Sequence, residues 1–154
     1  MLGTPFFSEG WALYAERVMR ERGFFTDPIQ ELYHLEATIF RAARIVVDTS
    51  LHMGEMTYDE AVKFMFEKTA LTEPTAKAEV GRYCTWPTQA SSYLTGCLEI
   101  LNIRERYLAA RGVASQPREE IPIDVLRDFH DGICGSGRLP VGLAEQAVMS
   151  TLPG

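Results

Sequence analysis

The chain has 154 residues, of which 46% are hydrophobic and 23% charged, a composition typical of a folded globular domain. Fifteen Lys and Arg residues against twenty-one Asp and Glu residues give a formal net charge of -6. The chain therefore lacks the positive electrostatic field that attracts the phosphate backbone of a nucleic acid, and we expect no nucleic-acid partner. Three scattered cysteines exclude a disulfide framework, and without a C-x-x-C pair they do not form a structural zinc motif.

Membrane and export signals are also missing from the sequence. The longest uncharged run, Cys84 to Leu98, is interrupted by Pro87 and several hydroxyl side chains, so it does not predict a membrane-spanning helix. The first residues carry neither the positive charges nor the apolar run of a signal peptide. We therefore expect no contact with a membrane and, by default, a cytoplasmic location.

Helix signals follow one another along the chain with short breaks, and no window shows the apolar and polar alternation of a half-buried strand. We expect an all-α fold, a multi-helix bundle in which residues 1–154 form a single domain. No internal repeat, low-complexity tract or linker divides the chain.

Capping residues predict the first two helices. The first should begin with Ser8 as its N-cap, run to Arg22 and stop at Gly23. Asp27 and Pro28 open the second helix, because Asp caps a helix and Pro is pre-set for its first position. Its apolar stripe, interrupted by one carboxylate, comprises Ile29, Leu32, Tyr33, Glu36, Ile39, Phe40, Ala43, Val46 and Val47.

Later helices are predicted from the same signals. Thr57 and Glu60 form a capping box that begins a third helix, which ends near Lys68. Gly96 lies inside a long predicted helix, where it indicates close approach of another helix or of a ligand. The remaining predicted helices are Pro74–Tyr83, Pro87–Arg111, 123–132 and 140–149.

Glu9 and Glu16 are the first candidate functional residues. They lie two turns apart on nearly the same face of the first predicted helix, beside Trp11 and Tyr14. Two carboxylates on a partly apolar face could bind a metal or exchange a proton. The alternative is a solvated face, or a salt bridge to a neighbouring arginine.

The second predicted helix carries four further candidates. Glu36 interrupts the apolar stripe, so we expect it to be partly buried and to need a partner or a raised pKa. Arg44 and Asp48 follow at i, i+4, and His52 stands just beyond. These residues form either a structural ion-pair network or a substrate-binding group.

The segment from Arg82 to Gly96 places an arginine, two tyrosines and a glutamine around a predicted helix start. Fixed donors of this kind can hold a carboxylate or stabilise a developing oxyanion. The alternative is that Tyr83 is a core aromatic and Gln89 a helix cap. No H-E-x-x-H motif occurs, and Ser91 and Ser92 have no His and Asp partner pattern.

Four ordered motifs resemble one known family. Residues 7–16 contain the E-G-W-A-L-Y-A-E signature of the bacterial domain-of-unknown-function family 885. Residues 44–52 resemble its R-x-x-x-D-T-G-x-H stretch, and residues 82–96 its R-Y-x-x-x-P-x-Q-A-x-S-Y-x-x-G stretch. Residues 129–140 resemble its closing F-H-D and G-x-L-P motifs. The resemblance covers essentially the whole chain.

Members of that family resemble zincin-type metallopeptidases, in which an upstream H-E-x-x-P-G-H-H-type helix supplies two His ligands and the general base. The resemblance implies that this chain is the C-terminal portion of a zinc-dependent peptidase or amide hydrolase. Carried over by position, Glu9 is the zinc ligand, supported by Tyr14 and Glu16. The catalytic candidates for oxyanion stabilisation are Tyr93 and Tyr83, and the substrate-binding candidates are Arg82, Gln89, His52 and Arg44.

The two His ligands and the base have no counterpart in this chain. Zinc is thus implied by the resemblance alone, and we expect this chain by itself neither to hold zinc stably nor to be active on a peptide-like substrate. The alternative is a non-catalytic helical module that self-associates or binds a partner. Under either interpretation, apolar faces around Phe6, Phe7, Trp11 and the second helix should be exposed, so we expect a homodimer or an upstream segment that covers them.

Overall fold

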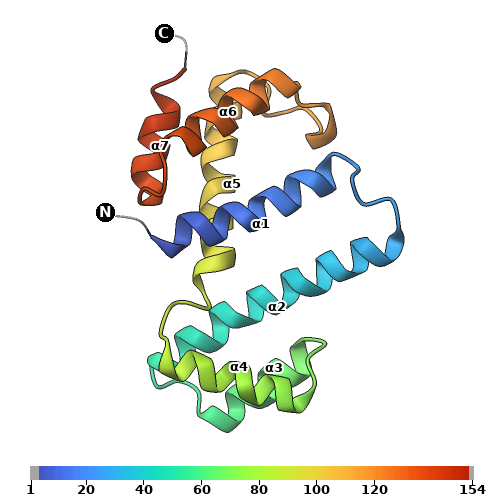
Figure 1. Ribbon diagram of the computed structural model, residues 1–154, viewed down its shortest axis with the longest axis vertical. Helices are drawn as coiled ribbons and strands as arrows, with labels where there is room; N and C mark the ends of the chain where they lie inside the picture. Colours follow the sequence, from blue (N-terminus) through green and yellow to red (C-terminus); the bar gives the residue numbers. More distant parts are fainter. Residues whose placement is uncertain (1–3, 153–154) are drawn as a thin grey trace. The chain divides into compact units, whose positions relative to one another are not determined.

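A computed structural model describes residues 4–152 of the chain, and within this range every regular element is helical (Figure 1). The predicted all-α fold is confirmed. The α-helices are α1 (Pro5–Glu21), α2 (Pro28–His52), α3 (Tyr58–Lys68), α4 (Glu73–Thr85), α5 (Ser92–Ala110), α6 (Ile123–Gly135) and α7 (Val141–Met149). A short 3-10 helix, η1 (Arg118–Glu120), lies between α5 and α6. No helix within residues 4–152 has both the length and the apolar character needed to cross a membrane.

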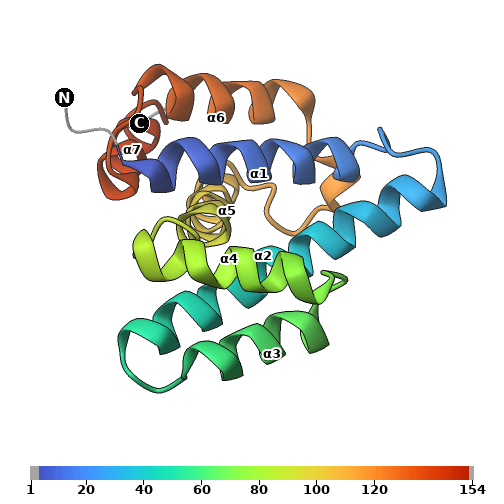
Figure 2. The same ribbon diagram turned by 60° about the horizontal axis from the view of Figure 1, so that its bottom comes forward.

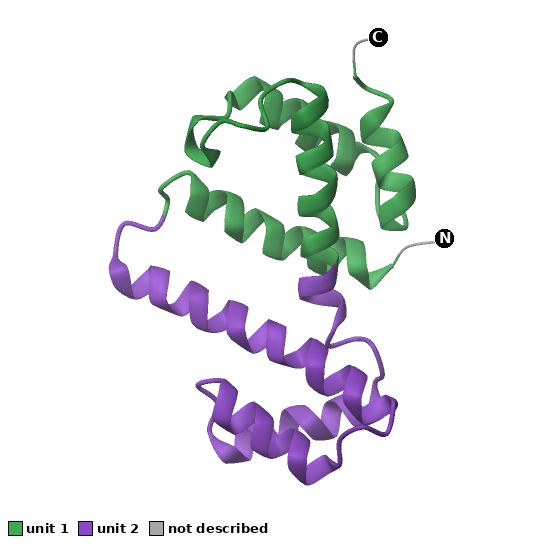
Figure 3. Cartoon of the chain, turned by 180° about the vertical axis from the view of Figure 1, so that it is seen from behind, with its two compact units in different colours: residues 1–24, 96–154 green, residues 25–95 purple. Residues whose placement is uncertain are grey.

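The chain divides into two compact units (Figure 3). Unit 1 contains residues 1–24 and 96–154, and unit 2 contains residues 25–95. In unit 2, helices α3 and α4 pack on each other and both contact α2 (Figure 2). The core of unit 2 is apolar and includes the fully buried side chains of Val47, Met65 and Tyr83.

Close approach of α1 and α5 in unit 1 depends on two glycines. A Cβ atom added to Gly96 would collide with the backbone carbonyl of Phe6, and one added to Gly10 would collide with the backbone of Gly96. Only glycine fits at such a crossing, because any side chain would push the two backbones apart. The close approach predicted from Gly96 is confirmed.

Two of the predicted helix starts have the expected side-chain caps. The Asp27 carboxylate accepts a hydrogen bond from the backbone N–H of Ile29 at 2.8 Å, at the start of α2. At the start of α3, the Glu60 carboxylate accepts from the Thr57 N–H at 2.8 Å, and the Thr57 hydroxyl accepts from the Glu60 N–H at 3.3 Å. Both caps rest on residues within three positions of each other, which is why the sequence predicts them.

Two other starts differ from the prediction. Helix α1 begins at Pro5 with Thr4 as its N-cap, so Ser8 lies inside the helix and its hydroxyl accepts from Arg138 Nε at 2.9 Å. Proline suits the first turn because it lacks the N–H that would have no partner there. Helix α5 begins at Ser92 rather than Pro87, because residues 87–91 form a turn in which Thr88 has a φ of 67°.

The predicted stripe of α2 spans two faces of the helix, and only one is buried. Ala43 and Val47 belong to the core of unit 2. The other face leaves Leu32, Ile39 and Val46 exposed by 61%, 53% and 44%. The expected exposed face on α2 is therefore present, whereas Phe7 of α1, expected to be exposed, is buried at 6%.

Candidate functional site

The α1 residues singled out in the sequence lie in unit 1. Glu9 is half-buried, and no hydrogen bond or ion pair of its side chain is recorded among residues 4–152. Glu16 is exposed. Tyr14 is fully buried, and its hydroxyl lies 2.8 Å from Nε2 of His130. Burial raises the pKa of Tyr14 and lowers the pKa of His130, so the protonated tyrosine donates to a neutral imidazole.

Glu9 does not form a complete metal site with the other residues in the range 4–152. In the described range of residues 4–152, no group of three or more His, Cys, Asp or Glu side chains could hold a metal ion. A catalytic zinc needs three protein ligands and one open position. The described residues thus do not fit a whole zinc site, and further ligands would have to come from outside them.

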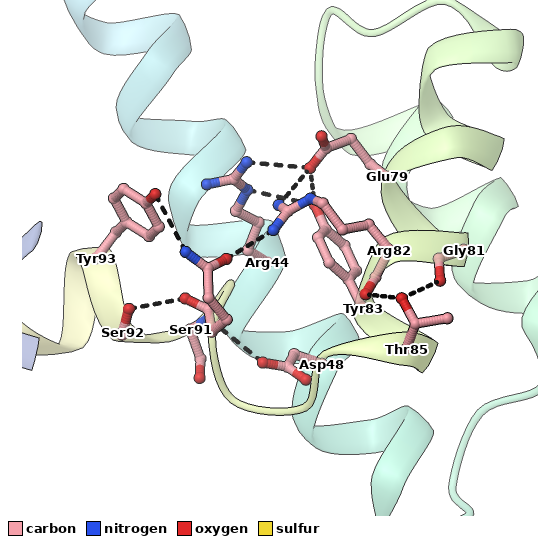
Figure 4. A network of polar contacts seen from close by, with 11 residues as sticks. Arg44, Asp48, Glu79, Gly81, Arg82, Tyr83, Thr85, Ser91, Ser92 and Tyr93 are labelled. Carbon is pink, nitrogen blue, oxygen red and sulfur yellow. Dashed lines mark hydrogen bonds and ion pairs between the residues drawn. The ribbon is translucent and has the colours of Figure 1, made fainter. Parts of the chain in front are cut away.

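A cluster of polar side chains in unit 2 connects α2, α4 and the start of α5 (Figure 4). Glu79 Oε2 stands at its centre and accepts three hydrogen bonds. They come from Arg44 Nη2 at 3.0 Å and Arg82 Nη2 at 2.9 Å. The third comes from the Tyr83 hydroxyl at 2.8 Å. We call Arg44, Glu79, Arg82, Tyr83, Gln89 and Tyr93 the arginine cluster.

Gln89 links the two sides of the arginine cluster. Its Oε1 accepts from Arg82 Nη1 at 2.6 Å, and its Nε2 donates to the Tyr93 hydroxyl at 3.2 Å. The Tyr93 oxygen is therefore used as an acceptor, and its own proton is free for another partner. The guanidinium of Arg44 lies 4.2 Å from the centre of the Phe40 ring and 5.2 Å from that of Tyr93, so the aromatic rings hold it in place.

The ion pairs in the arginine cluster leave an excess of positive charge. Arg44 and Arg82 carry two positive charges and Glu79 one negative charge, so the three groups sum to +1. Burial alone would raise the pKa of Glu79, but the hydrogen bonds from Arg82, Tyr83 and Arg44 outweigh it and lower that pKa. Burial and the bond to Glu79 raise the pKa of Tyr83. Glu79 is thus ionised and Tyr83 protonated at neutral pH.

Several donors of the cluster have no recorded partner among residues 4–152, and two of them lie on the Arg44 and Tyr93 side chains. No hydrogen bond of Arg44 Nη1 is recorded among residues 4–152, and Figure 4 shows this side of the guanidinium without a dashed line. A second unused donor is the Tyr93 hydroxyl proton. Arg44 exposes 12% of its side chain. An excess positive charge with a free N–H and a free O–H fits a carboxylate.

His52 lies beside a different hollow of unit 2. The hollow has a volume of about 250 Å³ and is lined by His52, Asp48, Thr88 and Ser91, among others. His52 Nδ1 lies 2.7 Å from the Asp48 carbonyl oxygen and 3.2 Å from Asp48 Oδ1. Asp48 is 2% exposed and accepts from the backbone N–H groups of Thr88 at 3.2 Å and Ser91 at 3.3 Å. Asp48 therefore fixes the turn that carries Gln89.

The structure brings five of the predicted site residues together: Arg44, Arg82, Tyr83, Gln89 and Tyr93. His52 approaches them only through Asp48 and the turn, and Glu9, Tyr14 and Glu16 lie in unit 1. Sequence reasoning missed Glu79, the acceptor at the centre. Its spacing of three and four residues before Arg82 and Tyr83 places all three on one helix face and could have indicated it.

Comparisons with known proteins agree with this fold. The model of a family described as "Bacterial protein of unknown function (DUF885)" matches residues 1–148. The chain is also similar to a crystal structure of the "putative lipoprotein" from Colwellia psychrerythraea, with 37% identity and a TM-score of 0.82. That similarity covers 95% of this chain but 24% of the other, so the chain spans about a quarter of that protein's length. No curated protein matches this chain.

Proposed function

Because the chain belongs to the DUF885 family of bacterial proteins, we propose that it is the C-terminal portion of a zinc-dependent peptidase or amide hydrolase. In this proposal the arginine cluster binds a carboxylate of the substrate. Glu9 supplies one zinc ligand, and two His ligands and the general base come from a segment outside the described residues. The chain alone is inactive.

The excess positive charge of the arginine cluster is the observation that carries the proposal. Arg44 and Arg82 share one carboxylate acceptor, so neither guanidinium is fully neutralised. The Arg44 guanidinium packs against the rings of Phe40 and Tyr93, so its side chain loses less conformational entropy when a ligand binds. The shared acceptor leaves one positive charge and some of its donors available to an anionic group of a ligand.

The two tyrosines have different roles in this proposal. Tyr93 keeps its hydroxyl proton available and contacts the substrate, where it can donate to a developing oxyanion. Tyr83 is buried and donates to Glu79, so it positions the carboxylate that holds both arginines. Gln89 and Arg82 orient Tyr93. His52 contacts the substrate from the neighbouring hollow, which it lines together with Asp48, Thr88 and Ser91.

On the metal side of the proposal, a bound zinc ion would activate a water molecule and polarise a carbonyl. Glu9 is suited to join such a site because its carboxylate is half-buried and has no recorded ion pair among residues 4–152. Tyr14 and Glu16 on the same helix are the proposed supporting residues.

Zinc content and turnover test the hydrolase proposal. The purified 154-residue chain should hold substoichiometric zinc by mass spectrometry and release no product from a peptide library. A polypeptide extended upstream through an H-E-x-x-H helix should bind one zinc, and its Glu9→Gln variant should lose it. One tightly held zinc with turnover by the 154-residue chain alone would overturn the proposal, as would an extended Glu9→Gln variant that retains its zinc.

The exposed face of α2 favours a second candidate function, a helical module that self-associates. Leu32, Ile39 and Val46 of α2, and Met53 directly after it, recur every seven residues and are exposed by 44–65%. An exposed apolar row of this kind favours association, and the same row on a second copy is a matching partner surface. In this candidate the chain forms a homodimer through α2. Light scattering should give twice the chain mass, and a monomer at micromolar concentration would refute it.

A further inference from the structure

A second hollow of unit 2 lies between α2 and the segment that follows α3. It has a volume of about 280 Å³. Tyr33, Phe40 and Leu71 give it apolar walls, and the carboxylate-bearing side chain of Glu36 lines it as well. A space of this size accepts one side chain of a ligand.

This hollow and the arginine cluster are neighbours that share Phe40. The Phe40 side chain lines the hollow, and its ring lies 4.2 Å from the Arg44 guanidinium. Glu36, Phe40 and Arg44 recur every four residues, which places them along one face of α2. Leu32, four residues before Glu36, continues this row, whereas Val46 lies on the neighbouring exposed side of α2.

Charges of opposite sign stand at the two ends of this face. The cluster around Arg44 has an excess of one positive charge, as described above. Glu36 is half-buried, and its carboxylate has no hydrogen bond or ion pair recorded among residues 4–152. A half-buried carboxylate without a partner favours the arrival of a cation. Glu36 and Arg44 are eight residue steps apart, a distance of about 12 Å along the axis of α2.

We propose that this face of α2 binds a short peptide with free amino and carboxyl ends and an apolar side chain between them. The inference rests on the proposed carboxylate site, where the peptide's carboxyl end meets Arg44. Its apolar side chain enters the hollow beside Phe40, and its ammonium group meets Glu36. Because an extended chain advances about 3.3–3.6 Å per residue, a span of about 12 Å corresponds to three or four residues.

Titration of the 154-residue chain with three forms of the tripeptide Ala-Leu-Ala tests the inference by NMR. The forms are the free peptide, its N-acetyl derivative and its C-terminal amide. The free peptide should bind about fivefold more tightly than the N-acetyl form, the size expected of a partly exposed ion pair. Glu36→Gln should abolish this preference, whereas Glu55→Gln, which changes an exposed carboxylate elsewhere, should keep it.

Each arm of the experiment reports on a different contact. Equal binding of the free and N-acetyl peptides, or a preference that survives Glu36→Gln, overturns the inference about Glu36. Equal binding of Ala-Leu-Ala and Ala-Gly-Ala overturns the role of the hollow, because burying a leucine side chain should improve affinity by about tenfold. Equal binding of the free peptide and its amide instead refutes the carboxylate site, and with it the proposed function.

Discussion

Replacing Asp48 by Ala should destabilise unit 2, because this buried carboxylate holds the turn before α5. Its two oxygens accept the N–H groups of Thr88 and Ser91 at 3.2 and 3.3 Å. A hydrogen bond to a charged acceptor contributes about 1.5–3 kcal/mol. The turn also holds Thr88 at a φ of 67°, a conformation that disfavours a β-branched residue. With both bonds to Asp48 removed, the strained turn keeps the side-chain bonds of Gln89 and the hydroxyl bonds of Ser91 and Ser92 to its own carbonyls.

The expected loss in the free energy of unfolding is about 2–4 kcal/mol, since both N–H groups are only partly buried and water replaces some of each bond. Asp48→Asn should cost less, because the amide oxygen still accepts one of the two bonds. Urea unfolding followed by circular dichroism measures these differences. Glu55→Ala, an exposed carboxylate change, should stay within about 0.5 kcal/mol of the parent. An Asp48→Ala variant as stable as Glu55→Ala would refute the assigned role.

Three further predictions concern packing, charge and association. Gly96→Ala should lower the unfolding free energy by about 1–3 kcal/mol or more, because the added Cβ meets the Phe6 backbone. Gly81→Ala, which has open space around it, should raise the unfolding free energy by about 0.5–1 kcal/mol. Thermal melts that rank the two variants the other way would contradict the packing. Folding lowers the pKa of Glu79 from 4.5, so the ionised carboxylate stabilises the fold fully above pH 4.5 and loses this effect as the pH falls through the folded-state pKa. The difference in unfolding free energy between the parent chain and Glu79→Gln should therefore shrink in acid. A difference that grows in acid would contradict this account. If α2 forms a dimer seam, Ile39→Glu should give a monomer by light scattering while Phe66→Glu, on an exposed position of α3, should not.

The parts of the fold that sequence patterns predict are those set by neighbouring residues. Asp27 with Pro28 and the Thr57–Glu60 box determine helix starts through contacts within three residues. The start of α5 is set instead by Asp48, forty residues away, which no local pattern shows. Gly96 lies between these cases, because its lack of a side chain indicates a crossing but not which helix crosses there.

The candidate site divides in the same way. The motif that contains Arg82, Gln89 and Tyr93 places these residues within eleven positions, so their proximity follows from the chain itself. The pairing of Arg44 with Glu79 joins two helices and depends on how α2 packs on α4. The i, i+4 spacing instead suggests Asp48 as the partner of Arg44, whereas in the structure the Asp48 carboxylate binds the backbone of the turn at residues 87–91.

Binding of N-acetyl-leucine and of its amide to the 154-residue chain measures most directly whether the arginine cluster recognises a carboxylate. The acid should bind about tenfold more tightly than the amide, because a charge-assisted contact to Arg44 is available only to the carboxylate. Arg44→Gln should remove this difference. If the acid and the amide bind equally to the parent chain, or if the difference persists in Arg44→Gln, the cluster is a structural ion-pair network and the proposed substrate role is wrong.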